Sequence, residues 1–234
     1  MPTRTISVIV PAANEERHLG ATIRAVREQS YPPHEVIVVV NGARDKTAQI
    51  ARAHADTVLE FKKLKGYCFP KNQGARVARG DIILFLDADT LLSTNTLGVI
   101  ARQCSTNTFG TVRGQGDSDS LEYDLYFAAR NFNHATGVHK GAMGCMFVDR
   151  ALFEHVGGFN EKLAVGEYFD FSKRATEMGG TYLYIDECSA TTSVRRYEQQ
   201  GGLLRNFAFW LSAAPRLLFN MGKKITRRDY PAMQ

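Results

Sequence analysis

Residues 80–90 read GDIILFLDADT, and this stretch decides the fold. Its five consecutive apolar residues, 82–86, predict a strand that is buried on both faces, which is typical of a parallel sheet. Asp87-Ala88-Asp89 follows the strand directly. Because ligands of open parallel sheets bind beyond the carboxyl ends of the strands, the two carboxylates predict a ligand site there.

Further strands and helices are expected on both sides of this stretch. The other expected strands are short apolar runs at residues 6–10, 36–40, 58–61, 143–148 and 181–185. The expected helices carry apolar residues at helical spacing and lie after a cap at Asn14, after a cap at Asp45, and over 72–78, 121–132 and 171–178. Strands that alternate with helices favour βαβ units, so we expect an α/β protein with a Rossmann-like, mostly parallel central sheet flanked by helices. The loops at 11–15, 41–45 and 87–89 would then lie on one edge of that sheet.

The composition is that of an ordinary globular domain. The chain has 234 residues, of which 44% are hydrophobic and 23% charged, so it is long enough to bury a substantial core. No apolar run reaches the roughly 18 residues that a membrane-spanning helix needs, and strand-like sequence begins too early for a signal peptide. The four cysteines lack CxxC spacing, which favours reduced, buried thiols in a cytoplasmic protein.

Positive charge is concentrated near the C-terminus. Residues 195–228 hold eight Lys or Arg and one acid, a net +7; the whole chain carries +5, so the remainder carries −2. Residues 202–221 are rich in Leu and Phe and predict an apolar helix, followed by a basic tail at 223–234. This helix and tail fit peripheral contact with the anionic inner face of a membrane, whereas packing on the core or on a second subunit of a homodimer is the alternative. We expect no nucleic acid partner.

Asp87 and Asp89 are expected to bind a metal ion. Carboxylate oxygens are preferred ligands of hard divalent cations such as Mg²⁺ and Mn²⁺. A cation there would bridge the phosphates of a nucleoside diphosphate and stabilise it as a leaving group. The alternative is a pair of aspartates in a surface turn, and the buried strand before them favours the metal site.

Lys71 is a candidate ligand for a phosphate group. It lies just before the expected helix at Asn72, in the segment Gly66-(x)5-Asn72-Gln73-Gly74. A cation beside the amides of a helix N-terminus suits a phosphate. An exposed lysine beside a helix cap is the alternative.

Together these motifs resemble the glycosyltransferases of family 2, which have the GT-A fold. The segments similar to the donor half of that family are SVIVPAANEE at 7–16, EVIVVVNGARDKT at 35–47 and KNQGARVARGDIILFLDADT at 71–90. The segments similar to the acceptor half are GAMGCMFVDRALFEHVGGFNE at 141–161 and GEYFDFSKRATEMG at 166–179. The resemblance covers roughly residues 5–195. It implies a single GT-A domain at 1–222, with a donor half at about 1–110 and an acceptor half at about 111–200.

The resemblance implies an inverting, metal-assisted sugar transfer. The donor would be a UDP- or GDP-sugar, and the acceptor a glycan, a glycolipid or a polyprenyl phosphate. Asp89 would be the main metal ligand, with Asp87 near the ribose or the metal. By position, the residues that would bind the nucleotide are Pro11, Ala12, Asn14, Glu15, Asn41, Lys71, Asp87 and Ala88, with Arg195 and Arg196 closing over the diphosphate.

Two positions depart from the family pattern. Asn41 stands where the family usually has an aspartate that reads the base edge, which leaves the base open. Tyr168 stands where the family has its catalytic carboxylate, and a tyrosine with a pKa near 10 is a poor base at neutral pH. We therefore expect Glu167 to be the general base, with Asp170 as the alternative. A helix that begins near Gly166 would put both carboxylates on one face.

Two other functions compete with sugar transfer. Tyr168 in the position of the base favours a non-catalytic nucleotide-sugar-binding protein of the same fold. A nucleotidyltransferase that makes the sugar nucleotide would carry a glycine-rich basic loop after the first strand, and PAANEE at 11–16 lacks that pattern. His139, near the expected acceptor entrance, is the one histidine considered for the site, and a core or surface histidine without a role there is the favoured interpretation.

Overall fold

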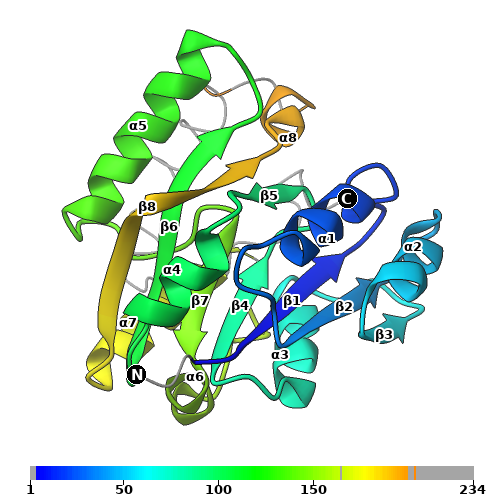
Figure 1. Cartoon of the computed structure of the whole chain (residues 1–234), viewed down its shortest axis with the longest axis horizontal. Coiled ribbons are helices and arrows are strands. Elements are labelled where there is room, and N and C mark those ends of the chain that lie inside the picture. The colour runs from blue at the N-terminus through cyan, green and yellow to red at the C-terminus, as the bar shows by residue number, and fades with distance from the viewer. Residues whose placement is uncertain (1–3, 164, 200–202, 204–234) are drawn as a thin grey trace.

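The computed structural model describes residues 4–163, 165–199 and 203 of the chain. Within these residues, eight strands form one sheet in the order β3-β2-β1-β4-β7-β6-β8-β5 (Figure 1). The strands are β1 (Ile6–Ala12), β2 (Glu35–Asn41), β3 (Thr57–Phe61), β4 (Ile82–Leu86), β5 (Thr90–Leu92), β6 (Thr108–Gly116), β7 (Cys145–Asp149) and β8 (Thr181–Thr192). Both halves of the chain therefore share one continuous sheet.

The sheet is mixed, with a parallel half that contains the N-terminal strands. β1 pairs parallel with β2 and β4, and β2 pairs parallel with β3. β8 is parallel to β6, whereas β7 is antiparallel to β4 and β6, and β5 is antiparallel to β8. Six of these eight strands point the same way, so the expectation of a mostly parallel sheet holds for strand direction. β7 is antiparallel to β6 because the connection between them, which contains α5 (Leu121–Ala135), does not cross back to the other end of the strands.

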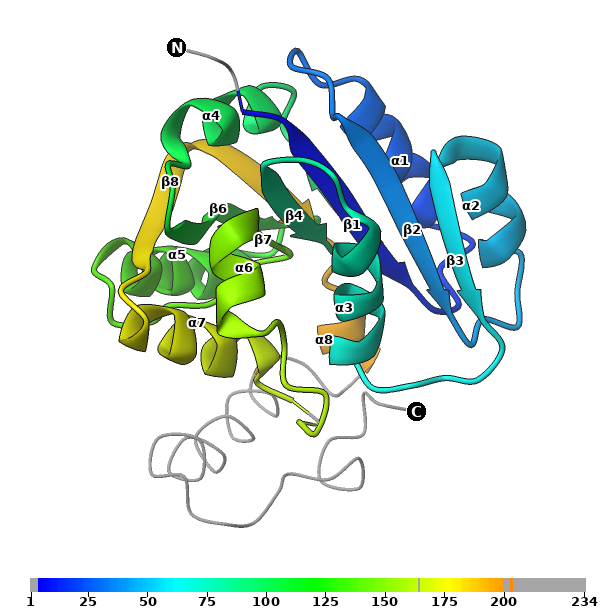
Figure 2. The same ribbon diagram turned by 90° about the horizontal axis from the view of Figure 1, so that it is seen from below.

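Helices cover both faces of the sheet (Figure 2). One core contains residues of α1, α2 and α4, and the other contains residues of α3, α6 and α7. The helices are α1 (Leu19–Arg27), α2 (Thr47–His54), α3 (Cys68–Val77), α4 (Thr96–Gln103), α5 (Leu121–Ala135), α6 (Arg150–Val156), α7 (Glu167–Glu177) and α8 (Arg195–Gln199). Successive residues of a strand, such as Val8 and Ile9, enter opposite cores, which is why the central strands are apolar throughout.

All six strands expected from the sequence are present. β6 was not expected, because its sequence TFGTVRGQG mixes glycine and polar residues with few apolar ones. α4 was not expected either, because six of its eight residues are buried and its apolar positions do not form a simple stripe. β5 and α6 are short, at three and seven residues, and short elements carry little periodic signal.

Two helices begin at residues other than those expected. Asn14 does not cap α1, because α1 begins at Leu19 and Asn14 has a φ of 57°. This is the left-handed region, which asparagine tolerates better than most residues. α3 begins at Cys68, four residues before the expected start, because Pro70 fits within the first turn of a helix. Lys71 therefore lies inside α3 and not before it.

Helix α5 is present where expected, but its apolar stripe faces outward. The stripe residues Leu121, Leu125 and Phe132 are 70%, 63% and 67% exposed. The opposite face of the helix, which includes Tyr123 and Phe127, is buried instead and packs with Met143 and Val194. A stripe of this kind ordinarily marks the face that packs on the core, so the orientation of α5 requires a separate explanation.

Gly110 allows β6 and β8 to approach closely. A Cβ atom there would lie 1.8 Å from the Leu183 carbonyl oxygen. We expect Gly110→Ala to lower the free energy of unfolding by about 2 kcal/mol or more, because overpacking typically costs about 1–3 kcal/mol. Urea denaturation measures this change. Gly66→Ala is the control, since a Cβ at that position would have no neighbouring atom within 4 Å, and equal losses in the two variants would contradict the close approach.

The predicted apolar helix at 202–221 and the basic tail at 223–234 lie outside the described residues, apart from Leu203. Leu203 is buried beside Tyr123 and Phe127. Among the described helices, none combines the length and the apolar character needed to cross a membrane. All four cysteines are free and buried, as the sequence predicts.

Candidate active site

The loops predicted to share one edge of the sheet do lie at one edge. β1, β2 and β4 are adjacent and parallel, so their carboxyl ends are aligned. Pro11 and Ala12 end β1, Asn41 ends β2, and Asp87 follows β4. This edge is where the fold exposes the ends of buried strands to a ligand.

The loop after β1 is held by the loop after β2. The Glu15 amide donates to Thr47 Oγ1 at 2.8 Å, and the Arg44 amide donates to Asn14 Oδ1 at 2.8 Å. These bonds fix Asn14 in its left-handed conformation and turn the Glu15 side chain inward, where the residue is only 4% exposed. A buried carboxylate of this kind requires partners.

Arg195 and Arg196 of α8 supply those partners. Arg195 donates to Glu15 Oε2 at 2.5 Å, and Arg196 donates to Glu15 Oε1 at 2.7 Å. Both guanidinium groups also lie 3.6 Å from Asp89 Oδ2. The two arginines, distant in sequence, therefore lie directly over the carboxylates that follow β1 and β4. Their predicted role in closing over a diphosphate stays a prediction, since the contacts seen here are with Glu15 and Asp89.

The backbone of the Asp87-Ala88-Asp89 segment is fixed on every side. The Asp87 amide donates to the Gly144 carbonyl at 2.9 Å, and the Ala88 carbonyl accepts from Thr22 Oγ1 at 2.8 Å. The Ser193 amide donates to the Asp89 carbonyl at 3.2 Å. A segment held this way presents its carboxylates with little conformational freedom.

Asp87 and Asp89 form a site that suits a cation. Burial raises the pKa of Asp87 to about 6, with the Asp89 carboxylate adding to the rise and Lys71 opposing it. The described residues contain no group of three or more His, Cys, Asp or Glu that could hold a metal by itself. Two carboxylates nevertheless fit Mg²⁺ or Mn²⁺, because such ions are often held by one or two carboxylates together with substrate phosphates and water.

Lys71 forms a buried ion pair with Glu167. Its Nζ donates to Glu167 Oε1 at 2.7 Å, and the two side chains are 5% and 15% exposed. Burial alone would lower the pKa of Lys71, but the Glu167 carboxylate outweighs it and the pKa is raised. The expectation of a lysine just before a helix, beside its N-terminal amides, is therefore wrong in geometry, since Lys71 lies within α3 and contacts the Glu167 carboxylate at the start of α7.

Tyr168 completes this cluster. The Lys71 ammonium lies 4.4 Å from the centroid of the Tyr168 ring, which is a cation–π contact. Burial raises the pKa of Tyr168, so its hydroxyl stays protonated. Among the described residues, the buried Tyr168 hydroxyl has no hydrogen-bond partner. A buried hydroxyl in this condition is available to a ligand.

The two candidate bases have different surroundings. Burial would raise the pKa of Glu167, but Lys71 more than offsets it, so the pKa lies below its ordinary value and Glu167 is ionised. Asp170 Oδ2 accepts two hydrogen bonds from Arg174, at 2.9 and 2.7 Å. Arg174 also donates to the carbonyls of Val156 and Gly158, so Asp170 braces the segment after α6. Gly166 precedes α7, as expected, but only Glu167 joins the cluster at Lys71.

Asn41 ends β2 at this edge, whereas His139 contacts α7 at Phe169, next to Tyr168 in sequence. The Asn41 side-chain amide forms two hydrogen bonds with the backbone of Lys65. It donates to the Lys65 carbonyl at 2.9 Å and accepts from the Lys65 amide at 3.0 Å. Asn41 thus holds the loop around Lys65 at the end of β2. His139 stacks on Phe169 with ring centroids 6.3 Å apart, and burial lowers its pKa.

Sequence reasoning missed Gly144, which supports the site from the start of β7. Its φ is 75°, and a Cβ there would lie 2.1 Å from Thr192 Oγ1, so only glycine fits where its carbonyl meets Asp87. The GAMG segment at 141–144, directly before an apolar strand, was the available signal.

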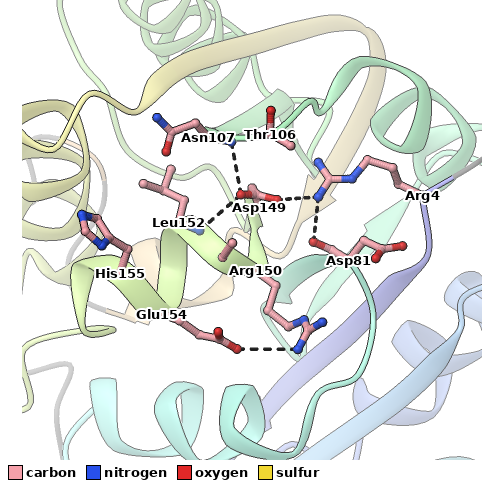
Figure 3. Close-up of a pocket in the computed structure, with 10 residues that line it drawn as sticks. Arg4, Asp81, Thr106, Asn107, Asp149, Arg150, Leu152, Glu154 and His155 are labelled. Atoms are coloured by element: carbon pink, nitrogen blue, oxygen red, sulfur yellow. Dashed lines mark hydrogen bonds and ion pairs between the residues drawn. The ribbon is translucent and has the colours of Figure 1, made fainter.

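A cavity of about 630 Å³ lies at the opposite edge of the sheet (Figure 3). It is lined by residues at the start of β4 and the end of β7, among them Asp81 and Asp149. Asp149 is paired with Arg4 and accepts from the amides of Asn107 and Leu152. Because its carboxylate is occupied by these contacts, we assign this cavity a structural role and place the candidate site at the other edge.

Solved structures with the same fold include a mannosyltransferase and a protein in complex with UDP. A mannosyltransferase from Pyrobaculum calidifontis, PcManGT, in complex with GDP-Man and Mn²⁺, has a TM-score of 0.68 at 19% identity. That match covers 98% of this chain and 68% of that chain. S. aureus TarS in complex with UDP has a TM-score of 0.65 at 20% identity, over 90% of this chain and 70% of that one. At these identities the likeness establishes the GT-A type of α/β fold.

Curated relatives are also glycosyltransferases. The chain is 28% identical over 188 residues to "Glycosyltransferase AglE" of Haloferax volcanii, covering 74% of this chain and 62% of the relative. It is 29% identical over 167 residues to "Undecaprenyl-phosphate 4-deoxy-4-formamido-L-arabinose transferase" of Aeromonas hydrophila, covering 65% and 50%. The chain thus spans about half to three fifths of the length of these relatives. The profile of the family described as "Glycosyl transferase family 2" matches residues 7–171, well over half of the chain, and the chain therefore belongs to that family.

Proposed function

We propose that the chain transfers a sugar from a UDP- or GDP-sugar to an acceptor hydroxyl or lipid phosphate, with inversion at the anomeric carbon. One observation carries the proposal. Asp87 interacts electrostatically with Lys71 and Arg196. Asp89 lies 3.6 Å from both Arg195 and Arg196, so the two carboxylates share the site with three cationic side chains. A diphosphate with a divalent cation matches this arrangement, because the cation can bind the carboxylates while the phosphate oxygens bind the cationic side chains.

Binding of the donor would replace ion pairs that residues of the site form with one another. Arg195 and Arg196 are paired with Glu15 and lie within 3.6 Å of Asp89. We propose that they turn to the donor diphosphate on binding, which frees Glu15 to accept from the ribose hydroxyls. Asp89, with Asp87, would hold a divalent cation that neutralises charge on the leaving diphosphate. Pro11, Ala12, Asn14, Asn41 and Ala88 would border the nucleoside.

Glu167 is the general base of the proposed reaction. Its carboxylate would take the proton of the acceptor hydroxyl while that oxygen bonds to the anomeric carbon and the bond from that carbon to the diphosphate oxygen breaks. The ion pair with Lys71 supports this role, since it keeps Glu167 ionised and holds it beside Asp87. The involvement of Asp170 with Arg174 favours a structural role for Asp170.

The acceptor would contact the second half of the chain. We propose a donor half at about 1–110 and an acceptor half at about 111–200, with Glu167 and Tyr168 at their junction. The name of the Aeromonas hydrophila relative describes a transferase for undecaprenyl phosphate, which supports a lipid-linked acceptor among the candidates. Peripheral membrane contact by the basic segment at 195–228 is part of this proposal.

A non-catalytic nucleotide-sugar-binding protein is the second candidate function. Tyr168 in place of the usual base, and the pairing of both neighbouring acids with cations, favour it. It predicts donor binding at the same residues without release of the nucleoside diphosphate.

A thermal-shift screen of nucleotides tests donor binding. We expect UDP or GDP with Mn²⁺ to raise the melting temperature, because a ligand at 100 times its Kd stabilises the native state by about 2.7 kcal/mol. For a chain of this size this corresponds to roughly 5–10 °C. CMP and AMP with Mn²⁺ serve as controls. No shift with any nucleoside diphosphate or nucleotide-sugar would contradict the proposed function.

A further inference from the structure

The outward face of α5 is apolar along its whole length. The residues of this face are Leu121, Leu125, Ala128, Ala129, Phe132 and Ala135, and all of them are exposed. Between residues 125 and 135 the only charged side chain is Arg130, which points to the inner side and donates to Tyr126 and the Ala142 carbonyl. Surface helices ordinarily carry charged residues on the exposed side, so a face of this kind marks a contact surface.

The spacing on this face is that of a helix–helix seam. Residues 121, 125, 128, 132 and 135 follow one another at intervals of four, three, four and three. This is the a/d repeat by which two helices pack along a shared axis. Residue 128 is the midpoint of the seam, and the alanine there lets two backbones approach closely.

We propose that α5 packs antiparallel against α5 of a second copy of this chain, forming a symmetric dimer centred on Ala128. In this arrangement Leu121 of one copy meets the partner subunit's Ala135, so that large side chains lie opposite small ones. A two-fold axis requires the same patch on both copies, and a seam with its midpoint at 128 meets that requirement.

Charge complementarity favours this antiparallel partner. The exposed acids Glu122 and Asp124 lie in the first turn of α5, and Lys140 follows its C-terminal end. Antiparallel packing brings the acidic end of one helix to the basic end of the other and also opposes the two helix dipoles. An anionic bilayer fits less well, because helices that lie on such surfaces are rich in Lys and Arg beside the apolar face.

The position of Leu203 also favours a second copy over the chain's own C-terminal segment. Leu203, the last described residue, is buried with Tyr123 and Phe127. These side chains belong to the inner face of α5, opposite the seam. Leu203 therefore lies on the side of α5 that faces the body of the molecule, away from the seam.

A cysteine cross-link tests the geometry in the full-length chain. All four native cysteines are buried, so Ala128→Cys introduces an accessible thiol. A disulfide needs Cα atoms about 4.4–6.8 Å apart, which a residue at the dimer axis can reach. We expect a covalent dimer after mild oxidation. Asn133→Cys is the matched control, since this residue is exposed on the same helix but outside the seam, and it should stay monomeric on a denaturing gel.

Sedimentation equilibrium tests the energetics. The parent chain is expected to show a concentration-dependent dimer, and Leu125→Glu with Phe132→Glu is expected to abolish it by burying four charges in the symmetric seam. Met178→Glu, at an exposed apolar residue that follows α7, should leave the dimer unchanged.

Three kinds of result would overturn this proposal. The first is a parent chain that is monomeric at every concentration, or a dimer that survives the double glutamate substitution. The second is a monomer whose co-sedimentation with phosphatidylcholine or phosphatidylserine vesicles is lost in that double variant, which would assign the face to lipid. The third is an Ala128→Cys variant whose new thiol becomes reactive to a maleimide only when residues 204–234 are removed, which would assign the face to the C-terminal segment.

Discussion

Replacing Asp89 with alanine is expected to weaken Mn²⁺-dependent binding of the nucleoside diphosphate by at least about 100-fold. The expectation follows from the loss of one of only two carboxylates at the end of β4, since direct metal contacts contribute several kcal/mol. Asp89 is 7% exposed and its side chain lies 3.6 Å from both Arg195 and Arg196, so the substitution removes charge from the centre of the site. Titration calorimetry of UDP and GDP, with and without Mn²⁺, measures the effect.

Asp81→Ala is the matched control for this experiment. Asp81 lies just before β4, at the other end of the same strand, and accepts from Thr5. Its loss should lower stability without changing nucleotide affinity. Parental affinity in Asp89→Ala, or equal losses in the two variants, would reject Asp89 as a metal ligand.

Substitution of Glu167 by glutamine is expected to reduce turnover by about 10²–10⁴-fold, the usual contribution of a general base. Glutamine keeps the shape of the side chain and can still accept from Lys71, but it cannot take a proton. Donor affinity should change far less than turnover. Because Lys71 then lacks its counterion, stability will also fall, and Lys71→Met combined with Glu167→Gln should recover stability without recovering turnover.

Two further variants separate Glu167 from its neighbours. Asp170→Asn should weaken the contact with Arg174 and leave turnover within a few-fold of the parent. Lys71→Met should shift the acidic limb of the pH–rate profile to higher pH, because the Lys71 ammonium is the main group that holds the pKa of Glu167 below its usual value against the effect of burial. Near-parental turnover in Glu167→Gln together with a large loss in Asp170→Asn would move the base to Asp170.

The buried strands and the edge they form could be predicted from sequence. β1, β2 and β4 lie between helices on both faces, so their apolar runs are long and unbroken. Parallel pairing then aligns their carboxyl ends, which brings Asn14, Asn41 and Asp87 to one edge without knowledge of any contact. The family resemblance added the expected roles of these residues.

The contacts across the site could not be predicted in the same way. Lys71 and Glu167 are 96 residues apart, and Arg195 is 180 residues from Glu15. Nothing in local periodicity links residues so distant in sequence. The a/d stripe of α5 was equally ambiguous, because the same spacing describes a helix packed on its own core and a helix packed on another molecule.

Release of the nucleoside diphosphate from a panel of UDP- and GDP-sugars tests the central claim most directly. With Mn²⁺ and a polyprenyl phosphate or glycan acceptor, the parent chain is expected to release UDP or GDP from at least one donor. A variant with both Asp89→Ala and Glu167→Gln is expected to release none above the uncatalysed rate. A parent chain that binds these donors tightly but releases no diphosphate from any of them would contradict a catalytic role and identify a nucleotide-sugar-binding protein.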